Sequence, residues 1–274
     1  MKKFYGKGQA DRLIKQHELS GGQKGIFGKS AQEHDVSIRQ VSSLVFSDIV
    51  EAYPKLEFRI RNTISKKEIN NYLKNIDKRL GDTLYIKKSS IKPDGRIIEV
   101  KDKAEKWRVI FVGESKHQGN DIEKIEAGIM QGKNKDQLFM VAGNAIERVH
   151  KNIMEMKNFM LLEKHFPYVV FFQGSNFATE SINIKTPNGK NIKLVHDSGS
   201  LNRIDRVTAS SYAMPINQNN TENILIQNNH NKISLQAASL YFQCFPWEAR
   251  DMYKIIYETI QSSLQILAAD LNDH

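Results

Sequence analysis

The sequence predicts an α/β fold in which helices cover a central sheet, because strand-like and helix-like segments alternate along the chain. The runs 107–112 and 168–172 are rich in Val, Ile and Phe, which is typical of buried strands. Apolar residues recur at helical spacing over 35–52 and 145–163. Strands mixed with helices in one chain are typical of layered α/β architectures.

The helices are predicted from apolar spacing together with start and stop signals. The glycine-rich stretch 21–25 ends the first helix-like segment. Ser65 followed by Glu68 forms a capping box, which marks the start of a helix. The expected helices cover 10–20, 35–52, the turns from Ser65 to Leu80, 120–131, 145–163 and 247–270.

The strands are predicted from short runs of β-branched and aromatic residues between turn signals. They cover 83–86, 96–100, 107–112 and 168–172, and the charged stretch 102–106 is the turn between the second and third of them. The stretch 174–232 is rich in Asn, Ser and Gly and gives only short strand signals.

Composition favours a folded protein with a polyanionic partner. The 274 residues include 40 Lys and Arg against 31 Asp and Glu, a net charge of +9 that is spread along the chain. Cationic side chains release counterions when they bind phosphates, so nucleic acid is a natural partner. No apolar run approaches the roughly 18 residues that span a bilayer, and no secretory signal is evident. The single cysteine, Cys244, cannot form an internal disulfide, so we expect a cytoplasmic protein without membrane contact.

Two carboxylates and a lysine form the strongest candidate site. Asp94 lies at the mouth of the strand 96–100, and Glu114 and Lys116 follow the strand 107–112. Residues two apart on a strand share a face, so Glu114 and Lys116 project together and Ser115 turns away. Two carboxylates suit Mg²⁺, and the lysine can orient a water or stabilise charge on a phosphate. The pattern therefore predicts Mg²⁺-dependent phosphodiester hydrolysis.

Structural interpretations compete with this site. Asp94 could cap a turn, while Glu114 and Lys116 could be a surface pair on an edge strand. A rival pair, Glu99 with Lys101, also shares a strand face. We reject it because Glu99 lies five residues from Asp94, an odd offset that would point the two carboxylates to opposite faces of one strand.

Five segments resemble, in the same order, segments of the EcoRI family of type II restriction endonucleases. They are 89–95, 114–119, 140–148, 201–206 and 214–217. The resemblance covers most of the chain and fades before residue 10 and between 218 and 230. Several long motifs in one order are far more specific than three site residues alone.

The resemblance implies a restriction-endonuclease core, a mixed five-stranded sheet flanked by helices, in a single domain covering 1–274. Within it we expect an N-terminal arm over 1–30, a catalytic core over 80–175 and DNA-recognition segments over 138–152 and 198–217. The family resemblance further implies a homodimer that cuts double-stranded DNA at the palindrome GAATTC, and a cognate methyltransferase in the host.

The resemblance also assigns the site residues. Asp94 and Glu114 would hold Mg²⁺, with the backbone carbonyl of Ser115 as a further ligand, and Lys116 would be the catalytic lysine. The family's usual residue at position 115 is alanine. Because this side chain points away from the metal in a strand, serine should be tolerated.

A set of DNA contacts follows from the same resemblance. Asn144 matches the adenine edge, and Arg148 offers donors to purine acceptors. The expected base-reading residues and neighbours are Met140, Val141, Asn144, Ala145, Glu147, Arg148, Arg203 and Arg206, with Arg203 and Arg206 favouring guanine. The expected backbone contacts and site neighbours are Lys92, His117, His150, Lys151 and Asn152.

One departure bears on specificity. Val141 stands where the family has alanine beside the outer pyrimidine. The added methyl groups predict less strict reading of the outer base pair, so RAATTY sites are the alternative to GAATTC. A repair or recombination nuclease with the same metal core, and a DNA-binding protein with an inactive site, are the rival functions.

Overall fold

The computed structural model of the chain describes ten stretches of residues. These are 31–82, 88–117, 119, 121–128, 136–138, 144–177, 180–195, 224–228, 231–235 and 238–271. The predicted helix 10–20, the arm 1–30, the predicted strand 83–86 and the recognition segment 198–217 lie outside the described residues.

A five-stranded mixed sheet forms the centre of the molecule. Its order is β1 (Phe58–Arg61), β4 (Ile97–Lys101), β5 (Trp107–His117), β7 (Tyr168–Gln173) and β12 (Ser239–Gln243). β1, β4 and β5 pair antiparallel, whereas β5, β7 and β12 pair parallel. The mixed sheet flanked by helices confirms the predicted fold class.

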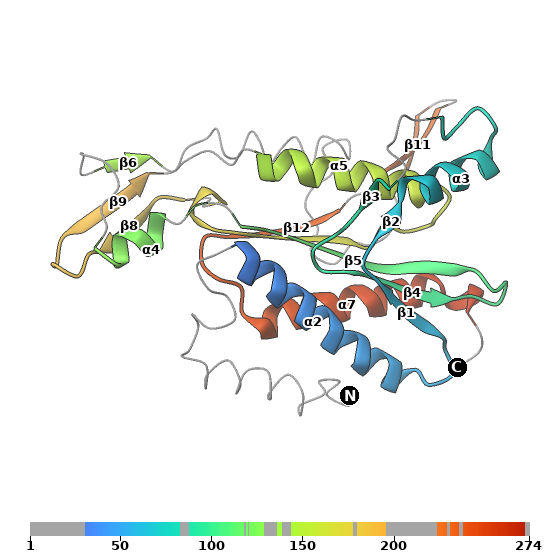
Figure 1. Cartoon of the computed structure of the whole chain (residues 1–274), viewed down its shortest axis with the longest axis horizontal. Coiled ribbons are helices and arrows are strands. Elements are labelled where there is room, and N and C mark those ends of the chain that lie inside the picture. Colours follow the sequence, from blue (N-terminus) through green and yellow to red (C-terminus); the bar gives the residue numbers. More distant parts are fainter. Residues whose placement is uncertain are drawn as a thin grey trace.

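Helices cover both faces of this sheet (Figure 1). α2 (Ala31–Ala52) and α7 (Ala249–Ile266) pack together on one face, and α3 (Lys66–Ile76) and α5 (Asn144–Phe159) lie on the other. Each face has its own apolar core, because alternate strand residues point to opposite sides. The strand β5 is central in both cores and carries the candidate site.

A β-bulge interrupts the pairing of β4 with β5. Ile98 pairs with Phe111, but Glu99 pairs with Val109, which leaves Ile110 as an extra residue on β5. Ile110 and Phe111 are consequently both buried in the core beneath α2 and α7. Strict alternation along β5 therefore holds only on either side of the bulge.

Helix starts agree with the sequence better than helix ends. Ser65 accepts a hydrogen bond of 3.1 Å from the backbone N–H of Glu68, as the capping box predicts. α3 nevertheless ends at Ile76, before the predicted Leu80. The expected helix 120–131 is also too long. α4 (Asp121–Glu126) stops early because Gly128 adopts a φ of 77° and continues the chain in a turn.

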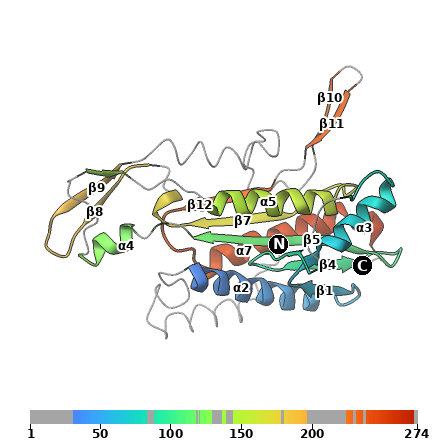
Figure 2. The same ribbon diagram turned by 45° about the horizontal axis from the view of Figure 1, so that its top comes forward.

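Smaller elements surround the core. α4 packs with a three-stranded sheet ordered β6 (Asp136–Leu138), β9 (Asn191–Val195) and β8 (Ile182–Lys185), which lies beyond one end of the central sheet in Figure 2. The remaining elements are β2 (Ile64–Ser65), β3 (Ser90–Ile91), β10 (Ile224–Asn228), β11 (Asn231–Leu235), η2 (Ser175–Phe177) and η3 (Ala268–Asp270). Among the described helices, none has the length and apolar character needed to cross a bilayer.

Candidate active site

Strand β5 carries two of the three predicted site residues. The strand extends to His117, beyond the predicted end at 112, so Glu114 and Lys116 lie within it and project to one face. Glu114 is 1% exposed, and the Lys116 side chain is 15% exposed. The neighbouring parallel strand β7 places Val170 beside Glu114 and Phe172 beside Lys116. A carboxylate and an ammonium are therefore fixed on rigid backbone.

A tight turn brings Asp94 to the same place. Gly95 donates a backbone hydrogen bond of 2.8 Å to Gly113, and Gly113 donates one of 3.0 Å to Arg96. Arg96 has a φ of 75°, which turns the chain into β4. A Cβ atom at Gly95 would lie 2.7 Å from Ile38 Cδ1 on α2 and 3.0 Å from the carbonyl carbon of Gly113 on β5, so this turn is packed closely between helix and sheet.

The Lys116 ammonium lies where three oxygen atoms converge. Its Nζ atom lies 2.5 Å from Asp94 Oδ2 and 2.7 Å from the carbonyl oxygen of Ser115, and it also donates to Glu114 Oε1. These are the two carboxylates and the backbone carbonyl that the resemblance assigns to the metal. Oxygen ligands of this kind are those that a hard divalent cation prefers. The donor set therefore fits such an ion.

Burial and charge shape the ionisation of this cluster. Complete burial raises the pKa of Glu114 above its ordinary value, and it outweighs the opposing attraction of Lys116. Burial alone would lower the pKa of Lys116, but Glu114 and Asp94 together raise it, so the lysine stays protonated. A single ammonium thus forms ion pairs with two carboxylates in a poorly solvated place.

Glu114 has two further partners. The Tyr168 hydroxyl donates a hydrogen bond of 3.1 Å to Oε2, and the Asn152 side-chain amide lies 3.2 Å from Oε1 and 3.3 Å from Oε2. Sequence analysis placed Asn152 on a DNA phosphate and read Tyr168 only as part of a buried strand. The available signal was a hydroxyl inside an otherwise apolar run, whose polar atom needs a buried partner.

The rival carboxylate Glu99 is occupied elsewhere. It forms ion pairs with Arg59 at 2.5 Å and with Arg61 at 3.4 Å. The parity argument used against it is wrong in its premise, because β4 begins at Ile97 and Asp94 is not on that strand. Neutralisation by two arginines is the physical reason that Glu99 is not available to a metal.

The predicted DNA contacts are described only in part. Lys92, Arg148 and Lys151 are exposed, and His150 is half-buried. His117 is half-buried at the end of β5, and burial lowers its pKa. Asn144, Ala145 and Glu147 belong to α5, but their side chains are not described, and Met140, Val141, Arg203 and Arg206 lie outside the described residues.

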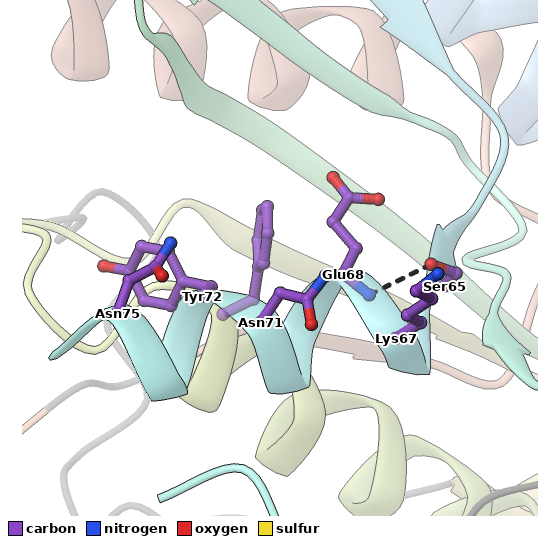
Figure 3. Close-up of a pocket in the computed structure, with 7 residues that line it drawn as sticks. Ser65, Lys67, Glu68, Asn71, Tyr72 and Asn75 are labelled. Carbon is purple, nitrogen blue, oxygen red and sulfur yellow. Dashed lines mark hydrogen bonds between the residues drawn. The ribbon is translucent and has the colours of Figure 1, made fainter. Parts of the chain in front are cut away.

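The hollow shown in Figure 3 is separate from this cluster. It has a volume of about 410 Å³ beside α3 and is lined by Ser65, Lys67, Glu68, Asn71, Tyr72 and Asn75 with Phe159 at the end of α5. Its only carboxylate, Glu68, forms an ion pair with Arg61. Within the described residues, no group of three or more His, Cys, Asp or Glu side chains could hold a metal. An ion at Asp94 and Glu114 would need backbone and water oxygens as further ligands.

Comparison with known proteins identifies the family of this chain. The family described as restriction endonuclease EcoRI matches residues 20–274. The type II restriction enzyme RsrI of Cereibacter sphaeroides is 56% identical over 271 residues, which cover 99% of this chain and 98% of the relative. The type II restriction enzyme EcoRI of Escherichia coli is 51% identical over 267 residues, 97% of this chain and 96% of the relative. The chain therefore belongs to the EcoRI family and is a type II restriction endonuclease.

Proposed function

We propose that this restriction enzyme hydrolyses double-stranded DNA with Mg²⁺ held by Asp94, Glu114 and the carbonyl oxygen of Ser115. The observation that carries the proposal is the convergence of these three oxygens on one cationic centre, the Lys116 ammonium. Type II restriction endonucleases generally need a divalent metal, and Mg²⁺ suits a site that offers few protein ligands and leaves room for water.

Bound Mg²⁺ would neutralise charge on the scissile phosphate and lower the pKa of a coordinated water. The chain's own residues supply the rest. Asp94 and Glu114 would fix the position of the ion. Asp94 precedes Gly95, whose backbone N–H is hydrogen-bonded to Gly113, and Glu114 lies on the central strand β5. When the ion binds the two carboxylates in place of Lys116, the three N–H donors of the ammonium would become available to the attacking water or to a phosphate oxygen.

We further propose that the enzyme is a homodimer that prefers GAATTC. A palindromic site calls for two-fold symmetry in its reader, so each protomer would cut one strand. The family resemblance supports the sequence of the site, and the 97% and 99% coverage by the relatives supports carrying over the base-reading residues. A methyltransferase of the same specificity would protect the host DNA.

The outer base pair is the proposed weak point of specificity. A bidentate arginine contact to guanine discriminates by about 1–3 kcal/mol, and strain around Val141 could offset about 1 kcal/mol of it. RAATTY duplexes should therefore be cut faster than any duplex with a changed inner base pair. Val141→Ala should restore strict reading of the outer base pair. Cleavage rates on duplexes that vary one base pair at a time, at fixed salt, measure this. Faster cleavage of inner variants would contradict the assignment of readers to bases.

The chemistry is tested by digesting a plasmid of known sequence with Mg²⁺ and mapping the ends. Asp94→Ala, Glu114→Ala and Lys116→Ala should each reduce cleavage by orders of magnitude and leave metal-free DNA binding measurable. Glu105→Ala is a matched control, since this exposed carboxylate lies on the turn that precedes β5, away from the site. Cleavage at the control rate by any site variant would remove that residue from the mechanism.

Sedimentation tests the assembly. We expect a dimer both free and bound to a GAATTC duplex. A monomer under both conditions would contradict the proposed symmetry.

A further inference from the structure

We propose that Tyr168 and Asn152 are positioning residues that hold the Glu114 carboxylate in its metal-binding orientation. The inference rests on the proposed function, in which Glu114 is a metal ligand. It goes beyond that function because it gives both residues a direct hydrogen bond to the metal ligand itself. Each acts on the ligand from a different element, β7 and α5.

Tyr168 holds one carboxylate oxygen from the sheet. Its side chain is fully buried, and its ring stacks on Phe166 with centroids 5.8 Å apart and an interplanar angle of 15°. In the parallel register Tyr168 lies opposite Val112, two residues before Glu114 on the same face of β5. The ring fixed in this way directs its hydroxyl to Glu114 Oε2, at 3.1 Å.

Asn152 holds the carboxylate from the helix above. Its amide nitrogen lies within 3.3 Å of both oxygens of Glu114. α5 is anchored at this point because the adjacent Val149 and Ile153 are fully buried. The amide nitrogen carries two N–H groups, and its distances to Glu114 show that it is directed to the carboxylate in this structure.

The two contacts hold the carboxylate unequally. Tyr168 donates to Oε2 alone, whereas the Asn152 amide lies near both oxygens and Lys116 donates to Oε1, in the position proposed for the metal. Glu114 is 1% exposed, so bulk solvent contributes little to holding its carboxylate. Removing either donor would let the carboxylate turn or leave an oxygen unpaired, which weakens the metal site without removing a ligand.

Asn152 also connects the site to the helix that the resemblance assigns to base reading. Arg148 lies four residues before Asn152, one helical turn away on the same side of α5. A displacement of α5 would therefore move a donor that holds the metal ligand.

The test compares two variants with two matched controls. Tyr168→Phe removes only the hydroxyl, and Asn152→Leu removes both amide groups at similar volume. Tyr253→Phe removes the same kind of hydroxyl–carboxylate bond, to Asp48 at 2.6 Å, on the other face of the sheet. Asn158→Leu makes the same change as Asn152→Leu further along α5. Ca²⁺ and Mg²⁺ binding to each protein on a GAATTC duplex is measured by calorimetry, together with metal-free DNA binding.

Tyr168→Phe and Asn152→Leu should each bind the divalent ion about 10–100-fold more weakly than wild type, as expected when a metal ligand loses its supporting hydrogen bond. Both controls should bind the ion like wild type, and metal-free DNA affinity should be unchanged in all four. Excess Mg²⁺ should recover part of the cleavage rate in the two variants.

Divalent affinity equal to the controls in both variants overturns the proposal, even if their melting temperatures fall. Weaker metal-free DNA binding by Asn152→Leu with normal ion affinity would make Asn152 a phosphate contact instead. If Tyr168→Phe does not fold, Asn152→Leu still decides the outcome. Failure of the proposed function looks different, because wild type itself would then show neither divalent binding nor Mg²⁺-dependent cleavage.

Discussion

Lys116→Met separates the chemical role of the lysine from its role in stability. The substitution removes the ammonium and keeps most of the aliphatic stem. In the absence of metal it leaves Glu114, which is 1% exposed, without its cation. Removing one partner of a buried ion pair costs about 3–5 kcal/mol, whereas loss of an exposed pair costs about 1 kcal/mol or less. We expect the larger value because the partner that remains is completely buried.

The size of the loss should depend on pH, on a second substitution and on metal. Protonation relieves an unpaired carboxylate, and each pH unit corresponds to about 1.4 kcal/mol. Burial raises the pKa of Glu114, so a larger fraction of this unpaired carboxylate is ionised as pH rises. The variant should therefore have a smaller free energy of unfolding at pH 8 than at pH 6. Glu114→Gln added to Lys116→Met should restore most of the stability. Mg²⁺ at 100 times its dissociation constant should add about 2.7 kcal/mol.

Urea unfolding at pH 6 and pH 8, with and without Mg²⁺ and at fixed protein concentration, measures these effects. Lys106→Met is the control, since this exposed lysine lies on the turn before β5. A metal-free Lys116→Met protein as stable as the control at pH 8 would refute the reasoning, because Glu114 would then not depend on the ammonium. Rescue by Mg²⁺ without rescue by Glu114→Gln would refute it as well.

Three further predictions concern the frame around the site. His165 is fully buried, and burial lowers its pKa to about 4 from 6.5. The free energy of unfolding of wild type should therefore fall by about 3 kcal/mol as pH falls from 6.5 towards 4. Urea unfolding should show no such loss in His165→Leu. Gly95→Ala should lower both thermal stability and cleavage rate, because the added methyl group would meet Ile38 at 2.7 Å and overpacking costs about 1–3 kcal/mol; wild-type values for both would contradict the close packing. Ser263→Ala should cost about 1–3 kcal/mol in urea unfolding and leave cleavage unchanged, because the buried hydroxyl lies 2.9 Å from the carbonyl oxygen of Ile110 at the bulge and 2.9 Å from that of Thr259 in its own helix. An unaltered unfolding free energy would mean that the hydroxyl does not stabilise the Ile110 carbonyl.

The alternation of side chains along a strand predicted the positions of Glu114 and Lys116 relative to each other. Glu114 and Lys116 share a face because alternation holds beyond the bulge, and two residues on one strand need no knowledge of the rest of the fold. The capping serine at Ser65 is equally local. The family motifs added the remainder of the predicted fold and its sheet.

Contacts between distant segments could not be predicted from spacing. Asp94 reaches Lys116 through a left-handed residue, Arg96, and through backbone bonds to Gly113, and none of these follows from the residue types. Tyr168 was missed for the same reason. Its hydroxyl meets Glu114 only because β7 pairs in parallel beside β5, and the sequence alone gives no register between strands that lie so far apart.

The charge balance of the cluster explains why a fold would keep it. When both carboxylates are ionised, they and the ammonium carry a net charge of −1 in a place where Glu114 is almost excluded from water. An apolar replacement of similar volume would serve stability at least as well. In the proposed mechanism a divalent cation would change this net charge to +1, and a DNA phosphate would bring −1, so the site would become neutral only with ion and substrate both bound. Lys116 would thus offset part of the buried negative charge before the ion binds, while the excess charge of the two carboxylates would favour the ion.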